Sequence, residues 1–148
     1  MSEIAFSAPS AEHGAFLAEA TTLAEQMAEE IIPGFRFDQS VSDLEMLQAI
    51  VDSGTLGDGA DPMFLLRCLG VVFGDVLRTS LPAGFAWAAF TDEYGCDLGL
   101  RFRETTISVF PVTMLSKRSE DGREIDVVAL HSSVVEHVQG MITSGDYQ

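Results

Sequence analysis

Basic residues are scarce in this chain of 148 residues: eight Lys and Arg stand against 23 Asp and Glu, a formal net charge of −15. A field of that sign repels nucleic acid and anionic membranes. We therefore expect no nucleic acid and no membrane among its partners, whereas a basic protein partner is favoured. Nucleic-acid mimicry by acidic helices is a further reading, which would require carboxylates at phosphate-like spacing.

Long apolar runs are also missing, and the chain has two cysteines, Cys68 and Cys96. Charged residues interrupt the longest apolar stretch well before the roughly 18 residues that a membrane-spanning helix needs. Residues 1–10 have neither the basic start nor the apolar segment of a secretory signal. The cysteines leave a disulfide open but are more typical of a reducing compartment. We expect a soluble, cytoplasmic protein.

Motifs for metal, cofactor or nucleophile chemistry are lacking as well. Neither C-x-x-C nor H-E-x-x-H occurs, and His131 and His137, six apart, fall on different faces of a helix. Residues 54–59 are rich in glycine but lack the lysine of a phosphate-binding loop. Acids flank Cys96, and they would raise its pKa rather than activate the thiol. We predict no catalytic residue, no metal and no cofactor, and we favour a protein that is not an enzyme.

What the chain does contain is a stretch, Asp61 to Leu81, that predicts a helix buried on nearly every side. Asp61 is a suitable N-cap, and Pro62 suits the first helical position, where its missing N–H is not needed. Apolar residues cover most of the circumference, so the helix needs neighbours on several sides. Gly70 and Gly74 share a face and would let another backbone approach closely. We expect this helix to be the centre of the fold.

Three amphipathic helices are predicted around it. Apolar residues at helical spacing indicate helices over residues 10–32, 42–54 and 126–143, the second opening with the capping box Ser-Asp-Leu-Glu. Residues 1–62 contain 12 acids and one base. The first two helices are therefore expected to form an acidic helical hairpin over residues 10–54, with residues 1–9 as a loose lead-in in which Phe6 could be an anchor.

After the central helix the apolar period changes from 3.6 to 2, which predicts strands. Side chains that would face opposite sides of a sheet alternate along residues 85–91 and 98–103, as in a strand. Residues 107–110 and 112–117 are also strand-like, on either side of Pro111. Because proline cannot donate to a ladder, we expect an edge or a bulge there. The strands then form an antiparallel meander of three or four members.

The order of elements predicts an α+β fold in a single domain, residues 1–148. It comprises the N-terminal helical hairpin, the central buried helix, the meander sheet, and a C-terminal helix packed on one sheet face. Residues 61–143 form the α+β core, and the other face of the sheet is expected to be wet.

A family resemblance supports this layout. Its signs are Leu69-Gly70-x-x-x-Gly74, a tryptophan strand at 85–87, an acidic turn and apolar strand at 92–101, Phe110-Pro111, Lys117-Arg118 before the turn ending at Gly122, and a helix beginning Asp126-Val127. The pattern resembles a bacterial family called domain of unknown function 3806, over residues 66–140. That family has no assigned activity, so the resemblance implies the layout and no chemistry, and the acidic hairpin lies outside it.

Four cations provide a candidate binding site: Arg101, Arg103, Lys117 and Arg118 are half of all basic residues and fall on segments predicted to be neighbouring strands. Arg101 and Arg103 share a face by the two-residue period. Such a cluster could hold a carboxylate or phosphate, which arginine binds bidentately. The alternative is cross-strand pairing with acids, for which the candidates are Asp92, Asp97, Glu104 and Glu120.

Two other features have simple structural explanations. Asp75, on the buried helix, is expected to form a salt bridge to Arg78 or Arg101. Phe85, Trp87 and Phe90 of the aromatic strand could line a pocket, although such residues are more typical of a core.

Two function classes therefore remain. The first is a non-catalytic binding or accessory module for a protein partner, chaperone-like or immunity-type, with the acidic hairpin facing a basic surface. The second is a small enzyme or ligand sensor that binds an anionic small molecule on the Arg/Lys face of the sheet. A homodimer is a separate open question, since 47% of the residues are hydrophobic.

Overall fold

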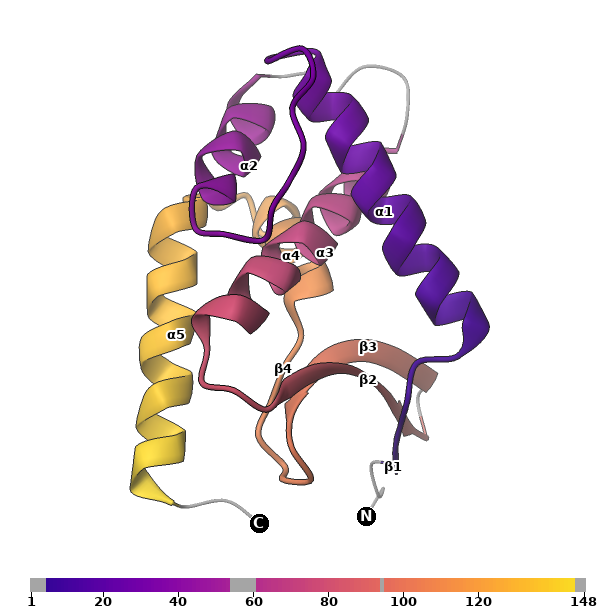
Figure 1. The fold of residues 1–148 in the computed structure, drawn as a ribbon, viewed down its shortest axis with the longest axis vertical. Helices are drawn as coiled ribbons and strands as arrows, with labels where there is room; N and C mark the ends of the chain where they lie inside the picture. Colours follow the sequence, from indigo (N-terminus) through magenta and orange to yellow (C-terminus); the bar gives the residue numbers. More distant parts are fainter. Residues whose placement is uncertain (1–4, 54–60, 94, 146–148) are drawn as a thin grey trace.

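The computed structural model describes residues 5–53, 61–93 and 95–145, in which helices lie to one side of an antiparallel sheet (Figure 1). The α+β class is thus confirmed. The elements are β1 (Ala5–Ser7), α1 (Ala11–Glu29), α2 (Asp43–Asp52), α3 (Pro62–Ser80), β2 (Phe85–Asp92), β3 (Gly95–Phe102), β4 (Ser108–Val109), the 3-10 turn η2 (Pro111–Thr113), α4 (Met114–Glu120) and α5 (Val127–Ser144).

Helix α3 is the centre of the molecule, as its composition predicted. The Asp61 carboxylate accepts a hydrogen bond from the Met63 amide at 3.0 Å, and Pro62 occupies the first turn. From Leu66 to Leu77 the large apolar side chains of the helix, among them Leu69 and Phe73, are almost fully buried, whereas Phe64 in its first turn is 36% exposed. In Figure 1, α3 crosses between α1 on the right and α2 and α5 on the left, so all of these helices share its core.

Helix α1 begins where the sequence indicated and ends slightly earlier. The Ser10 hydroxyl accepts from the His13 amide, and the His13 ring accepts from the Ser10 amide, each at 3.1 Å. Ala20, Ala24 and Ala28 are buried, because small side chains let α1 lie directly against α3.

The predicted capping box of α2 is wrong. Ser42 has a helical backbone and makes no capping hydrogen bond. The carboxylate of Asp43, which is 2% exposed, instead accepts from the Gln39 amide at 2.8 Å. The capping box does not form because the Asp43 carboxylate accepts hydrogen bonds from backbone amides of the preceding loop. That loop then holds Ser42 in a conformation in which its hydroxyl cannot cap the helix.

Helix α5 packs chiefly against α2 and α3. The Asp126 carboxylate caps it by accepting from the Ala129 amide, and Gln48 of α2 bonds both the Ile125 carbonyl and the Val127 amide. We expected this helix to pack on a face of the sheet. It joins strand residues in the common hydrophobic core, but its near neighbours are the two helices.

The sheet has the order β1-β2-β3-β4, with all pairs antiparallel. β2 and β3 form a hairpin in which Phe85 lies opposite Phe102 and Asp92 opposite Gly95. β1 comes from the segment expected to be a loose lead-in, and it adds an edge strand with Phe6 opposite Phe90.

The prediction of a strand over residues 112–117 is wrong. Pro111 begins η2, and α4 follows at once, with Leu115 and Ser116 buried. Gly70 of α3 explains the arrangement, because a Cβ there would overlap the carbonyl oxygen of Val112. The close approach of this connection to α3 turns an alternating apolar sequence into short helical turns.

Candidate functional site

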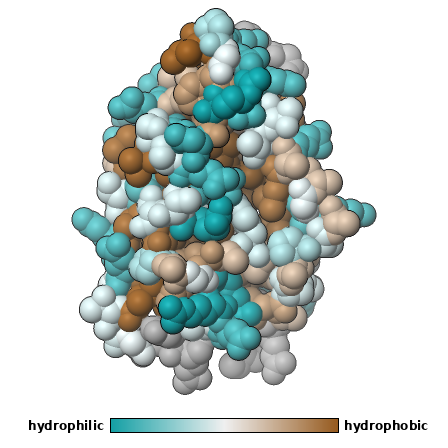
Figure 2. Space-filling model, in the orientation of Figure 1, coloured by the Kyte–Doolittle hydropathy of each residue, from teal (hydrophilic) through white to brown (hydrophobic). Residues whose placement is uncertain are grey.

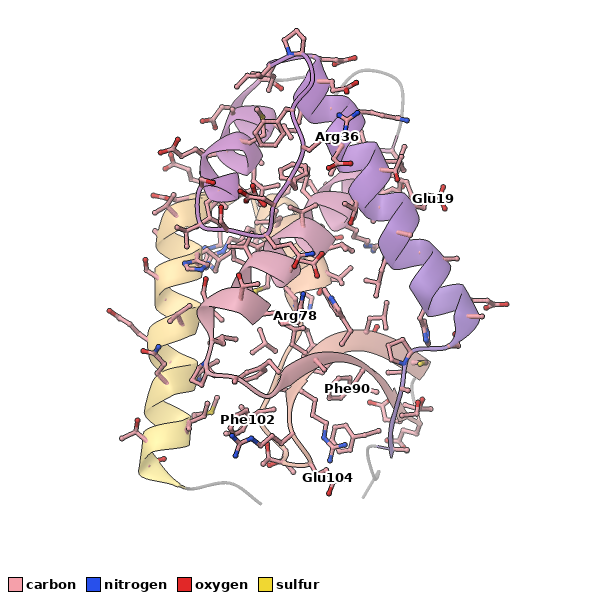
Figure 3. The ribbon with its side chains drawn as sticks, in the orientation of Figure 1. Glu19, Arg36, Arg78, Phe90, Phe102 and Glu104 are labelled. Atoms are coloured by element: carbon pink, nitrogen blue, oxygen red, sulfur yellow. The ribbon has the colours of Figure 1, made fainter. Side chains whose placement is uncertain are left out.

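The face of the sheet that points away from the helices carries a row of aromatic rings. Trp87 donates a hydrogen bond to Asp75 of α3, so its side chain points towards the helices. Phe90 lies three residues further along β2 and therefore points to the opposite face, because successive side chains of a strand alternate. Phe90 meets Phe6 edge-on at 4.9 Å between ring centroids and Phe110 at 4.8 Å. These rings leave Phe90 only 5% exposed. We call this side the outer face; Figure 3 labels Phe90 within it and Phe102 near the end of β3.

Arg101 is held on the outer face by two contacts. Its guanidinium lies 3.7 Å from the ring centroid of Phe6, and its Nε donates to the Thr105 carbonyl at 2.8 Å. Among the described residues, its two terminal nitrogens have no hydrogen-bond or ion-pair partner. The result is a fixed guanidinium whose forked end is available for a planar anion.

Arg103 follows the end of β3 and lies beside Arg101. Its backbone has a positive φ of 50°, its amide donates to the Gly84 carbonyl at 2.9 Å, and its guanidinium lies 4.9 Å from the Phe102 ring centroid. Gly84 permits this approach, since a Cβ there would come within 2.9 Å of the Arg103 side chain. The turn after β3 thus places a second cation on the same side.

Both arginines line a hollow of about 370 Å³, which we call the arginine hollow. In the part of the chain that the structure describes, no acid lines this hollow, although acids outnumber bases almost threefold in the sequence. The lining residues are Phe6, Ser7, Ala8, Gly84, Ala86, Trp87, Ala88, Arg101 and Arg103.

The structure separates the four predicted cations into two groups. Lys117 and Arg118 lie on α4, a helix rather than the expected strand. Lys117 lines a different hollow, between β4, α4 and α5, and Arg118 lines neither. In the part of the chain that the structure describes, none of the four lies within ion-pair distance of a carboxylate. The proposed cross-strand pairing is therefore not seen there.

The predicted salt bridge of Asp75 is wrong. Its carboxylate accepts from the Trp87 indole N–H at 3.0 Å, while Arg78 donates to the Gln39 side chain at 2.9 Å. Burial raises the pKa of Asp75, with the Trp87 hydrogen bond and the charge of Arg78 opposing the change. Arg101 is on the outer face, on the other side of the sheet.

Of the aromatic residues of β2 that could line a pocket, Phe85 and Phe90 are buried, and Trp87 borders the arginine hollow.

Sequence reasoning missed the pairing of Cys96 with His13. The Cys96 sulfur lies 3.8 Å from Nε2 of His13, across 83 positions of sequence, a separation that no local pattern reveals. Because Nδ1 accepts from the Ser10 amide, Nε2 carries the proton in the neutral ring. Both cysteines are free, so the disulfide between Cys68 and Cys96 that the sequence allowed does not form. Burial raises the pKa of the Cys68 thiol to about 11.

Histidine and the acids make no metal site within the described ranges: no group of three or more potential ligands is close enough together. His131 is buried, bonds to the Ser80 hydroxyl at 2.9 Å, and has a pKa lowered by burial, as expected of a structural histidine. In the same ranges, no helix is both long and apolar enough to span a bilayer.

Comparison with known proteins yields one family and one fold. A family described as Domain of unknown function (DUF3806) matches residues 43–131. The match begins earlier than the predicted residue 66, so it takes in α2, and it ends before residue 140.

A crystal structure from Bacteroides thetaiotaomicron has a TM-score of 0.76 at 15% identity. The alignment covers 90% of this chain and 48% of the other, so the chain spans about half the length of that neighbour, and the likeness concerns the fold alone. No curated protein matches the chain.

Proposed function

The chain belongs to the family described as Domain of unknown function (DUF3806), and we propose that it is a non-catalytic binding module whose arginine hollow takes a carboxylate or phosphate group. One observation carries the proposal. Arg101 is clamped between the Phe6 ring and the Thr105 carbonyl, and its two terminal nitrogens have no protein partner among the described residues. A guanidinium held in this way loses little further freedom on binding an anion.

The composition of the hollow favours binding over chemistry. The charged side chains that line it are the two arginines, and its described lining holds no carboxylate, histidine or cysteine that could transfer a proton or act as a nucleophile, while the indole N–H of Trp87 is bonded to Asp75 on the other side of the sheet. Alanines at 86 and 88 keep the floor low and leave room for a ligand. The hollow therefore offers charge and shape without a catalytic group.

The charge of the whole molecule sets the range over which the hollow acts. A net charge of −15 repels anions at a distance. At physiological ionic strength this repulsion fades beyond about 8 Å. Recognition must therefore come from direct contacts with Arg101 and Arg103, and binding should improve as salt is raised from very low concentrations before competition by anions weakens it.

Titration with citrate and with pyrophosphate, followed by amide chemical shifts, tests the proposal. We expect saturable shifts on β1, β2 and β3, and Arg101→Gln should weaken binding about tenfold or more, since a charge-assisted hydrogen bond contributes about 1.5–3 kcal/mol. Arg118→Gln is the matched control, because Arg118 lies outside the hollow. Equal affinity of both variants and the wild type would exclude the arginine hollow as the site.

A second candidate function uses the acidic helices. Within the described residues, Arg36 pairs with Glu29, while Glu12, Glu19 and Glu30 of the same helical region are exposed without an ion pair. Figure 3 shows Glu19 projecting from α1. We propose that this surface can bind a basic protein partner in a salt-dependent manner.

An octalysine peptide is a direct probe of the acidic surface. Its binding should weaken steeply between 50 and 300 mM NaCl and should fall on replacing Glu12 and Glu19 by Gln, while Arg101→Gln leaves it unchanged. Binding that ignores both the substitutions and the salt concentration would rule out this surface.

A further inference from the structure

A larger hollow opens on another side of the molecule, between β4, α4 and the C-terminal half of α5. We call it the α4–α5 groove; its volume is about 560 Å³, within the range of small-molecule sites. The residues lining it are Ser108, Val109, Phe110, Thr113, Met114, Lys117, Ser133, Val134, His137, Val138 and Met141. Nothing in the proposed function of the arginine hollow uses this groove.

Apolar side chains form the body of the groove. Val134, Val138 and Met141 follow one another at helical spacing along α5, and Val109 and Met114 line it from the sheet and from α4. Val138, which is 2% exposed, lies at the base of the groove, while Val134 and Met141 are half-buried beside it and pack against the same core. Figure 2 shows hydrophobic atoms at the surface on the lower left, where Figure 1 places this end of α5.

Two basic side chains border the groove from different walls: Lys117 projects from α4 and His137 from α5, and both are exposed. Lys117 has no carboxylate within ion-pair distance among the described residues. The described lining contains no acid, in a chain with 23 acids and eight Lys and Arg. An apolar trough with basic groups at its border matches a ligand with an apolar body and an anionic end.

We propose that the α4–α5 groove binds an anionic amphiphile, an aliphatic chain that ends in a carboxylate. The chain lies along Val134, Val138 and Met141, and the carboxylate accepts hydrogen bonds from Lys117, with His137 beside it. A second copy of this chain is a poorer occupant, because each copy carries −15 and a stable dimer needs about 1,200 Å² or more of buried surface.

Calorimetric titration with decanoate, below micelle-forming concentrations, tests the head group. We expect saturable binding to the full chain, with decan-1-ol binding at least fivefold more weakly. Lys117→Gln should weaken decanoate about tenfold and leave decanol unchanged. Arg118→Gln, on the same helix but outside the groove, is the matched control and should change neither. Decanol binding as tightly as decanoate would overturn the proposal.

A second variant tests the apolar body. Val134 is half-buried at the groove wall, so Val134→Trp should fill the groove without disturbing the core and should abolish decanoate binding. Arg101→Gln should leave decanoate binding intact, which keeps this site separate from the arginine hollow. Light scattering at two protein concentrations tests whether a second copy of the chain occupies the groove. A dimer that Val134→Trp dissociates would identify the groove as a subunit interface and overturn the proposal.

Discussion

Asp75 is a half-buried carboxylate on a helix whose buried residues are apolar, and its environment makes its charge costly. Burial raises its pKa above the ordinary 3.8, although the Trp87 indole donates a hydrogen bond to it. A carboxyl whose folded-state pKa is raised stabilises the fold at pH values below that pKa and loses this contribution as the pH rises. At neutral pH, therefore, ionised Asp75 destabilises the native state relative to a neutral side chain.

We expect Asp75→Asn to increase the free energy of unfolding at pH 7.5, because Asn keeps an acceptor for the Trp87 indole without the charge. The advantage over the wild type should shrink as the pH is lowered towards the ordinary carboxyl pKa of 3.8, because the raised pKa lets Asp75 take up a proton in the folded state first. Urea denaturation of both proteins at several pH values measures the difference. A difference that grows on acidification would show that the carboxylate is not disfavoured in the fold.

The two cysteines should differ strongly in reactivity. Cys68 is fully buried and its pKa is raised to about 11, whereas Cys96 is exposed beside the Nε2–H of His13. Because the thiolate is the reactive form, iodoacetamide at pH 8 should alkylate Cys96 and spare Cys68. Mass spectrometry of the peptides gives the ratio, and denaturant should make both react. Comparable labelling of the two thiols in the native protein would contradict the packing of α3.

Single residues were predictable where their partners are close in sequence. Asp61 and Asp126 cap helices as expected, because the amides that they accept from lie two and three residues ahead. Asp75 and Cys96 were not predictable, since Trp87 and His13 reach them only through the tertiary fold.

At the scale of elements, two glycines in helices make a matched pair. Gly70 of α3 faces the backbone of Val112 with no room for a Cβ, whereas Gly14 of α1 has no atom near its Cβ position. Alanine favours a helix over glycine by about 0.5–1 kcal/mol. Gly14→Ala should therefore stabilise the protein by about that amount, and Gly70→Ala should destabilise it by about 2 kcal/mol or more.

Thermal and urea denaturation of the two variants measure the contrast between these glycines. Both substitutions are chemically the same and both helices are well formed, so a difference reflects the contact between α3 and the connection at Val112. If Gly70→Ala were neutral or stabilising, the close approach that shapes η2 and α4 would be refuted.

The elements that the sequence failed to predict are those whose structure depends on distant contacts. β1 has three residues and no local period, and it exists because Phe6 packs on Phe90. Residues 112–117 alternate like a strand, yet they are held against Gly70 and form helical turns. Helices α1, α3 and α5 were predicted well, since each has a cap and a long apolar stripe.

The candidate site was also predictable only where its residues lie close together in the sequence. The two-residue period of β3 correctly grouped Arg101 with Arg103, which share the arginine hollow. Lys117 joins that group only if residues 112–117 form a strand; the residue lies on the helix α4 instead, at the α4–α5 groove. The contact of Phe6 with Arg101 was not predicted, because the sequence indicated only an anchoring role for Phe6 and no strand at β1.

At the scale of the whole molecule, charge is distributed unevenly. Residues 1–62 hold 12 acids and one base, whereas the arginine hollow and the α4–α5 groove have no acid in their described lining. Acids on the helical surface and bases at the hollows create a molecule that repels anions at long range and can accept them at two places. Binding to either place should therefore depend on ionic strength in a way that an uncharged ligand does not share.

The same excess of acid predicts how salt affects stability. With a net charge of −15 and a single ion pair, Arg36 with Glu29, among the described residues, like-charge repulsion acts against the compact state. Raising NaCl from 10 to 300 mM shortens the screening length from about 30 Å to below 10 Å. Because unfolding separates the charges, this screening removes more repulsion from the native state, and the melting temperature should rise by several degrees.

Calorimetry at pH 7.5 over that range of NaCl measures the effect of salt on the melting temperature. Chloride binding to Arg101 could also stabilise the fold, so Arg101→Gln is the required comparison. An equal rise in the variant assigns the effect to general screening, whereas a rise lost with Arg101 assigns it to the arginine hollow. A melting temperature that stays constant or falls with NaCl would mean that attractive pairs outweigh repulsion, against the distribution of charges in this fold.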